Sequence, residues 1–164
     1  MKSEHKQLNR DLLDSIIMRD IGRVRELLKQ GADVNSRDRE HNETALLLAA
    51  KFADAEMVRL LLDAGAEIDA RDDWGRTALF VTSVTSEVFE VLLDAGANIH
   101  ARDKEGHTIL MRKVSESASL SDVEKLLQLG VDPSVRTEDG ESALEMAENL
   151  GLLKVAERLR LRVG

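Results

Sequence analysis

The chain of 164 residues carries 31 acidic and 23 basic side chains. This excess of negative charge argues against nucleic acid or an anionic membrane as a partner, because both attract positive surfaces. There is no cysteine, which excludes disulfides and thiolate chemistry, and aromatic residues make up only 2%, so the core is expected to consist of Leu, Val, Ile and Ala. No apolar run approaches the length of a membrane span, and the first residues lack the apolar segment of a signal peptide. These features favour a soluble, cytoplasmic protein.

Pairs of short helices are expected along the chain, the first pair within residues 3–30. Further helices are expected near 44–51, 56–64, 77–83, 86–95, 121–129, 142–149 and 152–160. Thr44 and Asp54 are candidate N-caps, because their side-chain oxygens can accept a hydrogen bond from an exposed backbone N–H at a helix start.

Two later helices begin with capping-box spacing, Ser121 with Glu124 and Ser142 with Glu145. Gly96 follows the apolar segment EVFEVLLDA. We expect Gly96 to end that helix with a positive φ, a conformation that side chains disfavour.

The sequence repeats itself. Residues 61–72 read LLDAGAEIDARD and residues 92–103 read LLDAGANIHARD, while an arginine recurs at positions 37, 71, 102 and 136. Such a period is the signature of a repeat architecture, in which stacked copies bury the apolar faces that one copy cannot bury alone. The arginines stand at a fixed position of the scaffold, so we expect them to tie successive turns together.

The third copy departs from the others. It places Thr82 and Ser83 where the second copy has Ala49 and Ala50, and it lacks two residues between its helices. A poor central interface lowers the cooperativity of a repeat array, so we expect this copy to be its weakest part.

The repeated unit resembles the ankyrin repeat: a turn, the pattern G-x-T-x-L, AA, a helix ending in LL, and then G-A. The second copy, NETALLLAAKFADAEMVRLLLDAGAEIDAR, is similar along its whole length, and the resemblance extends over residues 8–160. It implies an all-α fold, an ankyrin-repeat α-solenoid of stacked helix-turn-helix units with projecting β-turn fingers. The expected single domain spans 1–164, with an N-terminal cap at 1–36, repeats at 37–70, 71–101 and 102–135, and a C-terminal cap at 136–164.

No pattern of residues indicates catalysis or a bound metal. The four histidines share no metal-ligand spacing, and the glycines occur singly rather than in a phosphate-binding loop. The acidic residues lie in expected turns and on solvated helix faces, where they serve solubility more often than acid–base chemistry. We therefore expect no enzymatic activity, no metal, no cofactor and no small-molecule substrate.

The resemblance implies that the chain, as a monomer, binds a partner protein through a concave surface formed by the turn tips and the first helices. The candidate contacts are the positions of this surface at which the units differ. They are Arg39, Glu40, Glu43, Lys51 and Phe52, then Asp73, Trp74 and Arg76, and finally Lys104, Glu105 and His107. Each also fits an ordinary solvated residue, since a minority of interface residues dominates binding energy.

Two alternatives stay open at this point. Trp74, the only tryptophan, is either an anchor for the partner or a ring that packs over an adjacent turn. The whole chain is a binding module, a purely structural array, or a small acidic inhibitor of the immunity-protein type that blocks a basic enzyme or toxin, a target that its negative charge would suit.

Overall fold

The computed structural model describes residues 2–116 and 119–163, and every regular element within these ranges is an α-helix. The helices are α1 (Lys2–Ile17), α2 (Ile21–Lys29), α3 (Ala45–Lys51), α4 (Ala55–Asp63), α5 (Ala78–Val81), α6 (Glu87–Asp94), α7 (Ile109–Ser115), α8 (Leu120–Gln128), α9 (Ala143–Asn149) and α10 (Leu153–Val163). The expected all-α class is confirmed. No helix in the described part of the chain is both long and apolar enough to cross a membrane.

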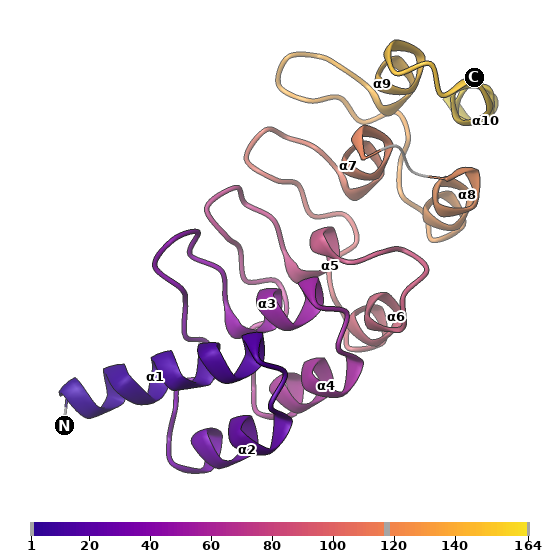
Figure 1. The fold of residues 1–164 in the computed structure, drawn as a ribbon. Helices are drawn as coiled ribbons and strands as arrows, with labels where there is room; N and C mark the ends of the chain where they lie inside the picture. The colour runs from indigo at the N-terminus through magenta and orange to yellow at the C-terminus, as the bar shows by residue number, and fades with distance from the viewer. Residues whose placement is uncertain (1, 117–118, 164) are drawn as a thin grey trace. The chain divides into compact units, whose positions relative to one another are not determined.

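The helices form two compact units, residues 1–98 and residues 99–164. In the first unit α1, α3 and α5 pack in one row, α4 and α6 pack in a second row, and the two helices of each pair contact one another (Figure 1). In the second unit α7 packs on α9 and α8 packs on α10, which is the same two-row arrangement.

Helix α3 shows how completely a helix of the first row is enclosed. All its residues from 45 to 50 are buried, whereas α4 buries only Met57, Val58 and Leu61. Since α3 contacts both α1 and α5, its small side chains at 45, 49 and 50 let the neighbouring helices approach closely.

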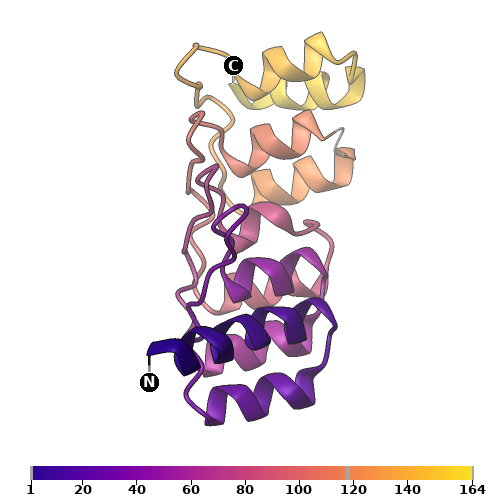
Figure 2. The same cartoon turned by 60° about the vertical axis from the view of Figure 1, so that its left-hand side comes forward.

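Between the helix pairs the chain makes four tight turns, which we call the first (37–43), second (71–76), third (102–107) and fourth (136–141) fingers. In the first unit the first and second fingers project beside one another (Figure 2). The closest approach to strand structure among the described residues is one isolated bridge in three of the fingers, such as that between Arg37 and Thr44.

The expected caps are largely confirmed. The side chains of Thr44 and Asp54 accept hydrogen bonds from the third backbone N–H of α3 and α4, at 3.3 and 3.0 Å. Ser142 and Glu145 form a reciprocal capping box at the start of α9.

The prediction that Ser121 caps the eighth helix is wrong. Ser119 caps α8, and Asp122 is the partner in its capping box. The segment SLSDVE contains two overlapping Ser-x-x-acid registers, and the helix uses the earlier one, which leaves Ser121 in its first turn.

Two other helices differ from expectation. The expected ranges contain no counterpart of α7. Lys113 in this helix is buried, with its ammonium 2.9 Å from Glu116. Helix α5 has four residues and ends before Thr82, which is extended at φ −89° and ψ 159°.

Gly96 ends α6 with φ 91°, as predicted. Its N–H bonds to the carbonyl of Leu93 and the next N–H bonds to Leu92, so two terminal carbonyls are satisfied. Gly96→Val should destabilise the protein by roughly 1–2 kcal/mol or more, because a β-branched residue is strained at positive φ. Thermal unfolding followed by circular dichroism measures the effect.

The matched control is Gly22→Ala, at a helical glycine where a Cβ would meet its nearest neighbour at an ordinary 3.5 Å. An unchanged melting midpoint for Gly96→Val would show that Gly96 is not a conformational requirement of the fold.

Residues 80–88 should exchange backbone amide hydrogens faster than residues 57–64. Helix α5 is short, its N-cap Thr77 makes no side-chain capping bond, and the buried Thr77 hydroxyl has no hydrogen-bond partner in the described chain. Local opening is easiest where few hydrogen bonds must break. Hydrogen exchange with peptide-level mass spectrometry tests this, and equal protection of the two segments would contradict it.

Candidate partner-binding surface

Each finger is closed by its own side chains. In the second finger one oxygen of Asp72 accepts hydrogen bonds from the backbone N–H groups of Trp74 and Arg76, at 2.9 and 2.8 Å. Gly75 supplies the positive φ of 79° that the turn requires. Because the buried carboxylate satisfies N–H groups that a loop would otherwise leave unpaired, the finger has one defined shape.

The same closure recurs in the other fingers. Asp38 accepts from His41 in the first finger, and Asp103 accepts from Glu105 and His107 in the third. In the fourth finger the hydroxyl of Thr137 accepts from the backbone N–H of Glu141.

Within each unit the two fingers are tied together, by Arg37 in the first unit and by Arg102 in the second, as predicted for these two of the four repeated arginines. Arg37 donates to the carbonyl of Arg71 at 2.7 Å, and Arg102 donates to the carbonyl of Arg136 at 3.1 Å. A backbone bond from Asp73 to the carbonyl of His41 adds to the contact between the first two fingers.

Glu43 is buried rather than part of the outer surface, with 2% of its side chain exposed. Its two carboxylate oxygens each accept from the ammonium of Lys51 at 2.9 Å, and one lies 3.5 Å from Arg76. Arg76 in turn bonds Asp72 at 2.7 Å. The two buried acids therefore hold two cations whose side chains remain 43% and 27% exposed.

Trp74 combines both of the alternatives considered for it. The guanidinium carbon of Arg76 lies 4.5 Å from the centroid of its ring, and the ring of His41 lies 4.9 Å away at an interplanar angle of 32°. The indole thus packs over the adjacent finger, yet 45% of the residue is exposed. The result is a large aromatic ring held in place at the surface.

The remaining candidates of the first unit lie around these groups. Phe52 is half-buried beneath Arg19, whose guanidinium lies 5.5 Å from the ring centroid. Arg39 and Glu40 are exposed and line a hollow of about 710 Å³ between the first finger and α1, with Leu13 and Ile17 also in its wall.

The third finger places its candidates in the second unit. Lys104 and Glu105 are exposed, but the side chain of His107 is only 17% exposed. Its Nδ1 lies 3.3 Å from Asp103 and 3.2 Å from Glu105, and Arg112 bridges the same two carboxylates at 2.5 and 3.3 Å.

Two groups of side chains approach a spacing that could hold a cation. They are Asp38, His41 and Glu43 in the first finger, and Asp103, Glu105 and His107 in the third. Protein cations already sit at both, since Lys51 and Arg76 contact Glu43, and Arg112 contacts Asp103 and Glu105. The spacing of the histidines alone does not reveal these groups, because each combines one histidine with two acids of the same finger.

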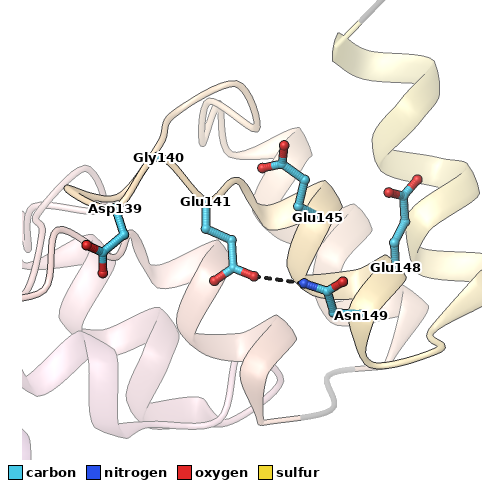
Figure 3. A pocket seen from close by; sticks show the side chains of 6 residues that line it. All are labelled: Asp139, Gly140, Glu141, Glu145, Glu148 and Asn149. Carbon is cyan, nitrogen blue, oxygen red and sulfur yellow. Dashed lines mark hydrogen bonds between the residues drawn. The ribbon is translucent and has the colours of Figure 1, made fainter.

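Sequence reasoning also missed an acidic hollow of about 400 Å³ at the fourth finger. Figure 3 shows Asp139, Glu141, Glu145 and Glu148 around it, with Asn149 donating to Glu141 at 3.1 Å. Arg136 and Arg160 offset part of this charge, through Glu145 and Glu148 respectively. The available signal was the stretch 138–148, which has five acidic residues and no basic one.

Comparison with known proteins identifies the family of the repeats. A family model described as ankyrin repeats (3 copies) matches residues 16–103, just over half of the chain. Neurogenic locus Notch protein of Drosophila melanogaster is 46% identical over 56 residues, which are 34% of this chain and 2% of that protein. Serine/threonine-protein kinase 12 of Arabidopsis thaliana is 45% identical over 58 residues, 35% of this chain and 12% of that protein.

Human ankyrin repeat and SOCS box protein 6 is 40% identical over 65 residues, 39% of this chain and 15% of that protein. The chain therefore matches only a small part of the length of these curated relatives.

The third finger should make stability depend on pH through Asp103. Burial raises the pKa of this carboxyl, but bonds and charge from Arg112 and the bond from His107 outweigh that effect and lower the pKa below its ordinary value. A lowered folded-state pKa contributes stability that is complete above the unfolded value of about 4 and is lost as pH falls through the folded value.

Asp103→Asn should therefore lower the melting midpoint at neutral pH, and its deficit relative to the unaltered chain should shrink as the pH falls below about 4. Asp73→Asn, at an exposed acid of the second finger, is the matched control. A deficit that stays constant over this pH range would rule out the ionised carboxylate as its source.

Proposed function

Since this chain belongs to the ankyrin-repeat family, a generic and generally non-catalytic protein–protein interaction module, we propose that it binds a partner protein through its fingers and first helices. Trp74 carries this proposal for the first unit. A tryptophan held by two neighbours and still 45% exposed gains apolar contact when a partner covers it, and it loses little side-chain freedom.

The other proposed contacts of the first unit come from the same two fingers and from the end of α3. Arg39, Glu40 and Asp73 are exposed at the two finger tips, and Lys51 and Phe52 lie at the end of α3. Buried Glu43 acts on a partner only by holding Lys51 and Arg76. In the second unit, Lys104 and Glu105 are the accessible candidates of the third finger, and Nδ1 of the largely buried His107 lies 3.2 Å from Glu105.

We propose the remaining assignments on general grounds. The lack of cysteine supports a reducing compartment such as the cytoplasm. The repeated helix-pair pattern supports one domain with caps at 1–36 and 136–164 around three repeats. A monomeric state is part of the proposal. The alternative of an acidic inhibitor or immunity-type protein gains no support from the relatives, and we do not propose it.

Trp74→Ala should weaken binding of the partner by about 2 kcal/mol or more, which is roughly 30-fold in Kd, while leaving the melting midpoint nearly unchanged. The unaltered chain and the variant serve as parallel baits in native lysate, and recovered proteins are quantified by mass spectrometry. The affinity of the protein that the variant loses is then measured with purified components.

Leu129→Ala is the matched control, because Leu129 is a 40% exposed apolar residue at the end of α8, outside the fingers. Its bait should recover the partner as the unaltered chain does. Equal recovery by the Trp74→Ala bait, together with a lower melting midpoint, would make Trp74 a packing residue and remove the main support for this proposal.

A further inference from the structure

We propose that the partner presents a carboxylate to the surface formed by Lys51, Trp74 and Arg76, which we call the cation–indole surface. This inference rests on the proposed function and adds the chemistry of the segment that docks. It concerns the first unit only, since all three residues and the groups that hold them belong to that unit.

At this surface the acidic side chains are buried and the basic side chains are partly exposed. The side chains of Glu43 and Asp72 are 2% and 0% exposed, whereas those of Lys51 and Arg76 are 43% and 27% exposed. The buried acids fix the positions of the cations, but a docking protein cannot reach them. An approaching segment therefore meets positive groups first, on a chain whose formal net charge is −8.

The hydrogen-bonding groups that remain on this surface are donors. A guanidinium has five N–H donors, and Arg76 spends one on a 2.7 Å bond to Asp72 and directs another at Glu43 over 3.5 Å. Within the described residues, no acceptor bonds the indole N–H of Trp74. A carboxylate supplies two acceptor oxygens, and bonds between ionised donors and acceptors are the stronger kind.

The surface is also fixed before any partner arrives. Asp72 holds the backbone at Trp74 and Arg76, the Arg76 guanidinium covers the ring, and the ring of His41 packs beside it. Groups already ordered lose less conformational entropy on binding than free side chains do.

The other fingers show that this arrangement is specific to the first unit. In the third finger Arg112 is likewise held by a buried acid, Asp103, but the 68% exposed Glu105 lies beside it. At the fourth finger Glu145 and Glu148 are themselves 44% and 45% exposed. Within the first and second fingers the exposed acids are Glu40 and Asp73, so we expect the docking carboxylate to be flanked by neutral or basic residues.

A displayed library of random short peptides tests the inference. Peptides are selected on the full 164-residue chain and counter-selected on Trp74→Ala, and both pools are sequenced. We expect Asp and Glu to be enriched in the peptides that depend on Trp74. In a selected peptide, replacing the acidic residue by its amide should weaken binding about tenfold or more.

Lys51→Gln provides an independent reading, because Glu43 keeps its 3.5 Å ion pair with Arg76, and the melting midpoint of the variant shows that the fold is retained before peptides are measured. It should raise the Kd of the selected peptides several-fold more than Lys104→Gln does. Lys104→Gln removes a similar exposed charge from the third finger. If the two changes raise the Kd equally, the preference for acidic peptides comes from the overall charge of the chain rather than from this surface, and the inference is overturned.

The remaining outcomes separate this inference from the proposed function. Peptides that depend on Trp74 but are basic, or show no charge preference, would overturn the inference and leave the proposed docking site standing. A selection that yields no peptide dependent on Trp74 would overturn both.

Discussion

A helix of two turns cannot enclose its own apolar side chains, and the first row of helices in this protein depends on neighbours for nearly all its burial. Helix α3 has seven residues, of which six are buried because α1, α4 and α5 surround it. This need for neighbours fixes the spacing of the copies along the chain. Each copy must form two helices, end the second one and return through a finger in nearly the same register.

The features that this constraint imposes were predictable from sequence. Thr44 and Asp54 cap helices because a first turn must satisfy its N–H groups, and Gly96 has a positive φ because the chain reverses there. Arg37 reaches the next finger as its fixed position suggested. At each of these positions the local geometry accepts only a few residue types. The residue type therefore predicts the local structure.

The errors arose where two local solutions compete or where contacts join distant residues. Ser119 and Ser121 both offer capping-box spacing, and α8 uses the first. Glu43 looked like a surface acid because one of its two cationic partners, Arg76, lies 33 positions away and in another finger, beyond any local pattern. The candidate surface was thus located approximately, but which of its residues are buried was not.

The ties between fingers have a consequence for how such a protein can diversify. Arg37 and Arg102 reach main-chain carbonyls of the next finger, and Asp73 donates its backbone N–H to the carbonyl of His41. No substitution at the receiving position removes a carbonyl oxygen. The side chains at a finger tip can therefore be exchanged, by evolution or by grafting in the laboratory, without cutting the connection to its neighbour. At Asp73, for example, the backbone N–H connects two fingers, while the exposed side chain is one of the proposed contacts for a partner.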